Sequence, residues 1–275
     1  MYKYLIVSYL LKDGYNVQIC ALICQTQFIL NNLRLKFITS ISYKMAWHCS
    51  GITNEEMVSK LKDANIIKNN KVEAAMLSVD RAKYCHDLNP YQDRPRGIGF
   101  SVTISAPHMH AYALTFLLDQ LFDGAKALDI GSGSGYLTAC MAHMVGVHGL
   151  VIGIDHITEL VEMSIQNVEE DHPEFLQDGR IKFLEGDGRL GAPAYGPYNA
   201  IHVGAAADSV PYKLIDQLVP GGRLICPVLL KEGSRKYQNL LQIDKNLDGS
   251  LKKTKLMDVT YVPLTDTKTQ LQNSS

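Results

Sequence analysis

Three alternating glycines are the residues of this chain whose spacing points most directly to chemistry. Gly131, Gly133 and Gly135 follow the apolar segment 125–130, and apolar residues at helical spacing resume at Leu137. The glycines therefore fall in a turn between a buried strand and a helix. Because glycine has no Cβ, such a turn lets a ligand approach the backbone, and the helix start offers free N–H groups. The pattern predicts a cofactor site.

Two carboxylates accompany this glycine turn. Asp129 lies two residues before Gly131, and Asp155 follows a second apolar segment, 150–154, twenty residues after Gly135. That is the usual distance for a carboxylate that holds ribose hydroxyls in a nucleotide-binding βαβ unit. The pair therefore favours a nucleotide-like cofactor over a tight turn without a ligand.

The spacing of the glycines separates the candidate cofactors. A dinucleotide-binding turn has the pattern G-x-G-x-x-G and faces a pyrophosphate. In the run 129–135, D-I-G-S-G-S-G, the third glycine comes one position early, and the run resembles motif I of the S-adenosylmethionine-dependent methyltransferases. That cofactor carries a sulfonium and no phosphate, so a nearby acid does not repel it. A dehydrogenase remains the alternative on this run alone, whereas the chain contains no G-x-x-x-x-G-K-[ST] phosphate-binding loop.

The composition is that of an ordinary globular chain. It has 275 residues, of which 46% are hydrophobic, and a formal net charge of -1. Basic residues are interspersed with acids, so we expect no nucleic-acid-binding face. Six cysteines without C-x-x-C spacing favour free thiols in a reducing compartment and no zinc site. The run Cys85-His86-Asp87 is not expected to bind a metal either, because adjacent side chains cannot all face one ion.

Residues 1–44 differ from the rest of the chain, with five basic residues and one acid. Their apolar runs are shorter than the about 20 residues that a membrane span needs, and the sequence Met45-Ala46-Trp47 looks like a natural start. We expect 1–44 to be an extension outside the core, 45–268 to form one catalytic domain and 269–275 to be a flexible tail. The chain end carries no retention signal and nothing demands a partner subunit, so we expect a cytosolic monomer that binds no membrane.

Helical and strand patterns alternate along most of the chain, which predicts an α/β fold with a doubly wound, mostly parallel sheet. Two late strands across the turn 246–249 are expected to form an antiparallel pair. The segment 89–100, rich in proline, glycine and charge, is expected to be an irregular loop. The first expected helix begins near Thr53, and the further expected helices cover 71–80, 107–121, 137–145, 157–170 and 210–218. The expected strands cover 125–130, 150–154, 181–184, 200–203, 223–228, 239–244 and 255–262.

Two further polar residues fall at predicted strand ends, where ligands collect in such a sheet. Asp187 follows the third strand and is suited to read an adenine edge, although an aspartate that stabilises a turn is the simpler alternative. His202 lies among apolar residues, where a hydrogen-bonded core histidine is at least as good an interpretation as a catalytic one. We therefore leave His202 outside the predicted site.

The segment 98–111 (IGFSVTISAPHMHA) is more specific than the glycine turn. Together with Asn89-Pro90-Tyr91 and with the run 200–206 (AIHVGAA), it closely resembles the protein-L-isoaspartate (D-aspartate) O-methyltransferases. The resemblance extends from Met45 to Asp266. It implies a Rossmann-like S-adenosylmethionine-dependent methyltransferase fold, and a protein repair enzyme whose partners are age-damaged proteins and peptides containing isoaspartate.

The reaction implied by the resemblance moves a methyl group from S-adenosylmethionine, which becomes S-adenosylhomocysteine, to the free α-carboxylate of an L-isoaspartyl residue, and to D-aspartyl residues as well. The methyl ester then closes to a succinimide without enzyme help. Since that carboxylate is already ionised at neutral pH, the reaction needs no general base. Alignment, proximity and partial removal of water are the contributions expected from the protein.

The resemblance also assigns residues. Ser105 matches the family's active-site serine, and we expect its hydroxyl to hold the carboxylate by a hydrogen bond and not to act as a nucleophile. Taken alone, Ser105 is also a good candidate for the N-cap of a helix that begins at Pro107. The substrate site is expected to comprise Val102, Thr103, Ile104, Ser105 and His110. The cofactor site is expected to comprise Val102, Thr103, Ile104, Ser105, His110, Asp129, Gly131, Ser132, Gly133, Asp155, His156, Asp187, Gly188 and Thr265.

Two departures from the family pattern stand out. Val102 adds bulk where many relatives carry alanine, and the segment 229–238 (LLKEGSRKYQ) replaces a glycine-richer run. The alternatives to the implied function are a methyltransferase with a different carboxylate acceptor, or a non-catalytic adaptor on the same fold.

Overall fold

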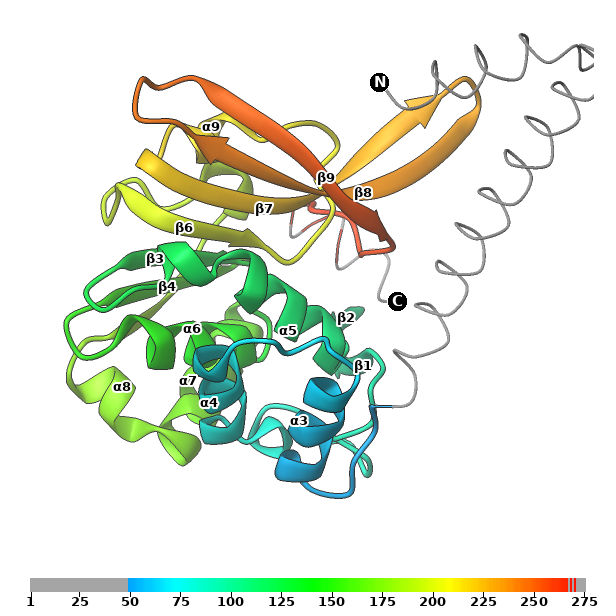
Figure 1. Ribbon diagram of the computed structural model, residues 1–275, viewed down its shortest axis with the longest axis vertical. Helices are drawn as coiled ribbons and strands as arrows, with labels where there is room; N and C mark the ends of the chain where they lie inside the picture. The colour runs from blue at the N-terminus through cyan, green and yellow to red at the C-terminus, as the bar shows by residue number, and fades with distance from the viewer. Residues whose placement is uncertain (1–48, 267, 269, 271–275) are drawn as a thin grey trace, which may run out of the picture. The chain divides into compact units, whose positions relative to one another are not determined.

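The structure is a computed structural model that describes residues 49–266, 268 and 270 (Figure 1). The predictions for residues 1–44 lie outside these described residues. The prediction of a flexible tail over 269–275 also lies outside the described residues, except at Gln270, whose side chain is buried.

A seven-stranded sheet organises the described chain, in the order β5-β4-β3-β6-β7-β8-β9. Its first five strands run parallel, and β8 and β9 continue it in antiparallel fashion. The predicted sheet with an antiparallel C-terminal pair is therefore confirmed. The strands are β3 Lys126–Ile130, β4 Leu150–Asp155, β5 Ile181–Glu185, β6 Tyr198–Val203, β7 Leu218–Glu232, β8 Arg235–Lys245 and β9 Leu251–Val259.

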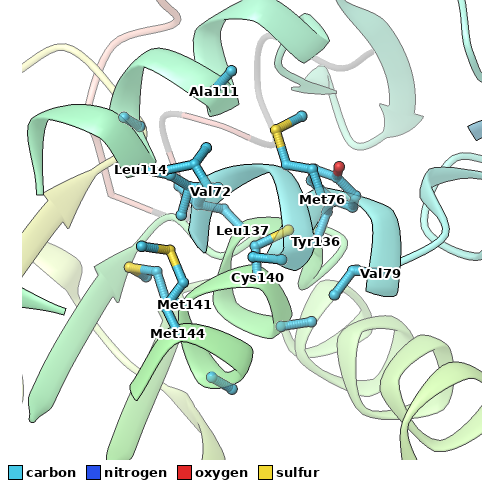
Figure 2. Close-up of a cluster of buried hydrophobic side chains, with 14 of the residues drawn as sticks. Val72, Met76, Val79, Ala111, Leu114, Tyr136, Leu137, Cys140, Met141 and Met144 are labelled. Carbon is cyan, nitrogen blue, oxygen red and sulfur yellow. The ribbon is translucent and has the colours of Figure 1, made fainter. Parts of the chain in front are cut away.

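Both faces of this sheet bury apolar side chains, as alternation along a strand requires. Ala127, on one face of β3, belongs to a cluster that also contains residues of the helices on that side, whereas its neighbour Leu128 belongs to a second cluster with Leu214 of α9. Figure 2 shows part of the first cluster, where Met76 of α4 and Leu114 of α5 pack on α6. The helices are α3 Asn54–Asp63, α4 Asn70–Ser78, α5 Pro107–Phe116, α6 Tyr136–Val145, α7 Thr158–Asp171, α8 Pro173–Gln177 and α9 Tyr212–Ile215.

The topology places a switch in strand order beside β3. The chain passes from β3 through α6 to β4 on one side, whereas the strand on the other side, β6, comes later in the sequence. Loops that leave the carboxyl ends of β3 and β6 therefore diverge, which opens a crevice at this edge of the sheet. The glycine turn leaves the end of β3 at this crevice.

The predicted irregular loop at 89–100 is partly wrong. Its last residues form β1, Arg96–Gly99, which pairs with β2, Val102–Ile104, in an antiparallel hairpin. The connecting residues Phe100 and Ser101 have φ of 51° and 55°. Such left-handed residues suit a two-residue hairpin turn but are usually glycine or asparagine, so these two residue types did not indicate a turn.

Several predicted boundaries also differ from the structure. The helix predicted to Leu121 ends at Phe116 and is followed by a 3-10 turn, Leu118–Gln120. The helix predicted over 210–218 is confined to α9, and its predicted last residue, Leu218, is already the first residue of β7. α8, which begins at Pro173, was not predicted. β7 and β8 are much longer than the predicted strands 223–228 and 239–244 and form an extended hairpin.

Candidate active site

The glycine turn connects β3 to α6 in a conformation that needs glycine. Gly131, Gly133 and Gly135 have φ of 73°, 55° and 85°, in the left-handed region that L side chains avoid. The backbone N–H groups of Gly131 and Ser132 donate to Ile154 O at 2.9 and 3.1 Å, which ties the turn to β4. A Cβ on Gly131 would meet no atom of the described chain within 4 Å. The turn is thus fixed, and the backbone at Gly131 faces open space.

Asp155 lies at the end of β4 beneath this turn, as predicted, and is 7% exposed. Its Oδ2 accepts from the N–H of Gly133 at 3.1 Å, and its Oδ1 from the N–H of Ile157 at 3.3 Å. Burial raises the pKa of this carboxyl, and the hydrogen bonds from Gly133 and Ile157 oppose that rise. Asp155 is therefore held in place while retaining lone pairs that can accept hydrogen bonds from ligand hydroxyls.

Asp129 is buried at the end of β3 and accepts hydrogen bonds on both oxygens. Thr138 Oγ1 donates to Oδ2 at 2.6 Å, and His202 Nδ1 lies 2.7 Å from Oδ1. Asp129 and His202 are opposite one another in the register of the adjacent strands β3 and β6. His202 is thus hydrogen-bonded, which agrees with the interpretation of a core histidine. It also lines the cleft described below. The sequence could not show this, because the register of two strands 73 residues apart is not visible in it.

The other wall of the crevice comes from the segment between β2 and α5. Ser105 follows β2, and its side chain lies close enough to the phenol of Tyr261 to lower the pKa of that phenol. The prediction that Ser105 caps the following helix is wrong: the N-cap residue of α5 is Ala106, and the N–H of His108 in the first turn donates instead to Asp93 Oδ1 at 3.0 Å. Burial raises the pKa of Tyr261 to about 12, so its phenol stays neutral and able to donate near pH 7. Tyr261 was not among the predicted site residues.

A buried arginine supports this second wall of the crevice. Arg81 is 0% exposed, and its Nη2 donates to Ser105 O at 2.9 Å, its Nε to Pro90 O at 2.8 Å. Its Nη1 lies 3.4 Å from His110 Nδ1, and the guanidinium stands over the ring of Tyr136, 5.6 Å from its centroid. No carboxylate in the described part of the chain forms an ion pair with Arg81. A buried cation without a direct carboxylate partner in the described chain therefore lies behind Ser105 and His110.

Arg81 also fixes the state of His110. Burial first, and then the charge of Arg81, hold the pKa of His110 well below its usual value, so the imidazole is neutral. Since Arg81 can only donate, Nδ1 of His110 accepts and the proton resides on Nε2. Nothing in the sequence around Arg81 indicated this role, because the residue is separated from Ser105 by 24 positions.

All predicted site residues except Asp187 line one or both of two neighbouring cavities that share Thr103, Gly131 and Gly204. Together we call these two cavities the cleft. The first cavity is lined by Val102, Thr103, Gly131, Asp155, His156, Gly188 and Thr265. The second is lined by Thr103, Ile104, Ser105, His110, Asp129, Gly131, Ser132 and Gly133, and also by His202 and Tyr136.

Asp187 is the predicted site residue that lines neither cavity. Its carboxylate accepts from Arg189, with Nη2 at 2.8 Å and the backbone N–H at 3.0 Å, and it caps a short 3-10 helix, Gly188–Leu190. Its pKa is lowered chiefly by the hydrogen bond from the Arg189 side chain. The structure therefore shows it in the turn-stabilising role, while its neighbour Gly188 reaches the cleft.

The residues of the cleft fit a ligand with hydroxyls, an amino group and a carboxylate. The Oγ of Ser132 is buried and has no hydrogen-bond partner within the described chain, and the backbone at Gly131 leaves room for a ligand. Asp155 supplies an acceptor for hydroxyls. Among residues 49–266, 268 and 270, no group of three or more His, Cys, Asp or Glu side chains is arranged to hold a metal ion.

Comparison with known proteins agrees with these features. The family model described as "Protein-L-isoaspartate(D-aspartate) O-methyltransferase (PCMT)" matches residues 52–269. The chain is 47% identical over 226 residues to a protein-L-isoaspartate O-methyltransferase of Caenorhabditis elegans, covering 82% of this chain and 98% of that protein. It is 47% identical over 232 residues to protein-L-isoaspartate O-methyltransferase 1 of Arabidopsis thaliana, covering 83% and 99%.

A solved structure is similar to most of the chain as well. It is a Plasmodium falciparum chain assigned as a protein-L-isoaspartate O-methyltransferase and crystallised in complex with S-adenosyl-L-homocysteine. The TM-score is 0.72 at 37% sequence identity, and the match covers 78% of this chain and 99% of that chain.

Proposed function

Because the chain belongs to the protein-L-isoaspartate (D-aspartate) O-methyltransferase family, we propose that its cleft holds S-adenosylmethionine on the side of the glycine turn and an isoaspartyl carboxylate on the side of Ser105. The chain is an S-adenosylmethionine-dependent methyltransferase that acts on L-isoaspartyl residues of damaged proteins. The observation that carries the assignment of the two sides is that Ser105 and Asp155 line adjoining cavities at one edge of the sheet.

On the donor side, we assign the ribose hydroxyls to Asp155 and the amino-acid part of the cofactor to the backbone around Gly131 and Gly133. Ser132 Oγ is a buried donor without a partner among the described residues, which supports a polar ligand group next to it. His156, Gly188 and Thr265 line the other end of the same space. Asp187 must release Arg189 before it can contact an adenine, so its assignment depends on a rearrangement.

On the acceptor side, we assign the isoaspartyl carboxylate to the hydroxyl of Ser105 and to Nε2–H of His110, with Val102, Thr103 and Ile104 around it. Arg81 supports this assignment because its buried charge favours an anion nearby. The neutral His110 donates a hydrogen bond without placing a second positive charge against the sulfonium. When bound, S-adenosylmethionine supplies the activated methyl group.

The chain's own contribution is alignment. The acceptor carboxylate is ionised at neutral pH, so no side chain has to remove a proton. Ser105 and His110 fix the direction of one carboxylate oxygen, and the buried walls of Tyr136 and Leu137 exclude water from the second cavity. Methyl transfer from the sulfonium to the carboxylate neutralises both charges, and a partly desolvated cleft favours that loss of charge.

Further features of this function are also proposals. We expect activity on D-aspartyl residues, a cytosolic monomer, and no binding of nucleic acid or membranes. In the described ranges, no helix has the length and apolarity to cross a membrane. We also propose that residues 45–268 suffice for catalysis, so that a chain starting at Met45 keeps activity.

The experiment that tests the function uses labelled S-adenosylmethionine and two peptides that differ only in carrying L-isoaspartate or L-aspartate at one position. We expect base-labile methyl incorporation into the isoaspartyl peptide alone. Equal labelling of both peptides, or no labelling by folded protein that binds S-adenosylhomocysteine, would overturn the assignment.

A further inference from the structure

The β7–β8 hairpin extends past the end of the sheet at its antiparallel side. β9 ends at Val259, opposite Gln238, whereas β7 and β8 stay paired up to Glu232 and Arg235 (Figure 1, upper right). Among the described residues, no strand therefore pairs with the outer edge of β8 at 235–237. This two-stranded ribbon contains the segment that departs from the family pattern.

The tip of the hairpin carries three basic residues and one acid, Glu232. Lys231, Arg235 and Lys236 are exposed or nearly so, and Lys231 pairs directly with Lys236 across the two strands. Like charges opposite one another destabilise a hairpin, and an anion placed between them removes that cost. Within the described part of the chain, none of the three forms an ion pair with a carboxylate, although Glu232 is the cross-strand neighbour of Arg235.

A groove lies between this ribbon and the end of β9; we call it the hairpin groove. It is lined by Glu232, Arg235, Lys236, Tyr237, Lys255 and Asp258, among others. Asp258 is paired with Lys255 at 2.8 Å, so those two charges neutralise each other. Arg235 stands over the ring of Tyr237, 5.9 Å from its centroid. The groove thus combines two basic side chains, Arg235 and Lys236, with an aromatic ring and an unpaired strand edge. Glu232 is the acidic side chain that opposes these two positive charges.

The hairpin groove adjoins the cleft. At its inner end, Gln238 Nε2 donates to Tyr261 O at 3.0 Å, and Tyr261 N donates to Gln238 Oε1 at 2.7 Å. The phenol of Tyr261 lies near the Ser105 side chain, and Val262, the next residue, lines the first cavity of the cleft beside Val102 and Thr103. Tyr261 thus connects Gln238 of the hairpin groove to the wall of the cleft.

We propose that the hairpin groove binds acidic residues that flank the isoaspartyl residue of the substrate polypeptide. This proposal rests on the proposed function, because only an acceptor within a polypeptide has flanking residues that must cross the surface beside the cleft. An extended segment can follow the free edge of β8. Its carboxylates then meet Arg235 and Lys236 and relieve the repulsion between Lys236 and Lys231.

The test compares two isoaspartyl peptides of equal length, one with Asp and Glu and one with Ser and Gln at the flanking positions, in versions that place the changes on either side. For the unaltered protein we expect kcat/KM to be about 10-fold higher for an acidic peptide, since each exposed charge pair contributes only severalfold. The ratio should fall toward one near 1 M salt, where the screening length is about 3 Å.

The variant R235E/K236E should lose this preference and keep its activity on the neutral peptide, which also shows that it folds. The matched control K68E/K213E changes two exposed lysines outside the groove by the same charge and should keep the preference. Equal kcat/KM for both peptides in the unaltered protein, or an unchanged preference in R235E/K236E, would overturn the proposal. If no isoaspartyl peptide is methylated at all, it is the proposed function that fails.

Discussion

The donor and acceptor sides of the cleft are built in different ways. The donor side comes from one continuous βαβ unit, in which the glycine turn, Asp129 and Asp155 lie within 27 residues and backbone groups make most of the contacts. The acceptor side brings together Arg81, Ser105 and Tyr261 from distant parts of the chain and depends on side chains. The comparison teaches that methyl-donor binding is a local property of the chain, whereas acceptor recognition is a property of the tertiary structure.

If the two sides act separately, changes on the donor side should alter cofactor affinity, and changes on the acceptor side should alter turnover with cofactor affinity kept. Each of the following changes tests that separation.

The largest effect is expected for Asp129→Ala on the donor side. The change leaves the buried donors of Thr138 and His202 without their acceptor, which should lower the free energy of unfolding by about 3 kcal/mol and weaken S-adenosylhomocysteine binding. Thr138→Val is the milder control, because it removes one hydrogen bond and should cost about 1 kcal/mol. Denaturant unfolding and calorimetric titration measure both. An Asp129→Ala protein of unchanged stability would show that this network does not hold the donor side.

Arg81→Met should affect mainly the acceptor side. It removes the donors to Ser105 O and His110 Nδ1, so we expect kcat/KM for an isoaspartyl peptide to fall about 30-fold, equivalent to about 2 kcal/mol. Arg81→Lys, which keeps the charge, should recover part of the loss. Titration with S-adenosylhomocysteine should show little change. If cofactor affinity fell in parallel with turnover, the two sides would not be separable at Arg81.

A pH effect is expected from Asp155. Its pKa in the folded protein is raised by burial, so the folded protein holds this proton more tightly than the unfolded chain does. Asp155 therefore contributes stability below the unfolded pKa, and this contribution is lost as pH rises through the folded pKa, by about 1.4 kcal/mol for each pH unit that separates the two pKa values. Over the same window cofactor affinity should rise, because the ionised carboxylate is the better acceptor for ribose hydroxyls.

Asp155→Asn is the comparison for this prediction. Unfolding experiments from about pH 4 upward, near the ordinary pKa of an aspartate, should show that the stability difference between the unaltered protein and D155N changes with pH in the stated direction. Calorimetry should give D155N a weaker affinity that does not rise over that window. A pH-independent difference would mean that Asp155 titrates in the same range folded and unfolded.

The smallest effect is expected for Tyr261→Phe. The ring stays and the hydroxyl near Ser105 is lost, so turnover should fall about 3-fold to 5-fold if the two hydroxyls hydrogen-bond when the substrate is bound. Peptide kinetics at saturating S-adenosylmethionine measure this. No change in turnover would show that Ser105 holds its orientation without Tyr261.

The donor side could be predicted from the sequence better than the acceptor side, for a physical reason. The glycine turn and Asp155 follow from period and spacing within one βαβ unit. His202 lies in the cleft because of the register of β3 and β6, and Arg81 lies behind Ser105 because of tertiary packing. Neither cause produces a local pattern in the sequence. Ser105 itself was predicted only by resemblance to a family.

The fold shows the same division. The parallel sheet followed from the alternation of strands and helices, whereas the β1–β2 hairpin and the length of the β7–β8 hairpin were missed. The two central residues of the β1–β2 turn, Phe100 and Ser101, have positive φ although neither is glycine or asparagine, so the sequence did not indicate a hairpin turn there. The β7–β8 hairpin continues through Lys231 and Lys236, whose charges are not typical of a strand.

The separation of the two sides is tested most directly by Ser105→Ala, with S-adenosylhomocysteine affinity and turnover of one isoaspartyl peptide measured on the same sample. We predict affinity within about 2-fold of the unaltered protein and turnover lower by about 10-fold to 100-fold, the effect of one hydrogen bond to a charged group. A loss of cofactor affinity with turnover retained at saturating cofactor would contradict this separation, because it would place Ser105 on the donor side.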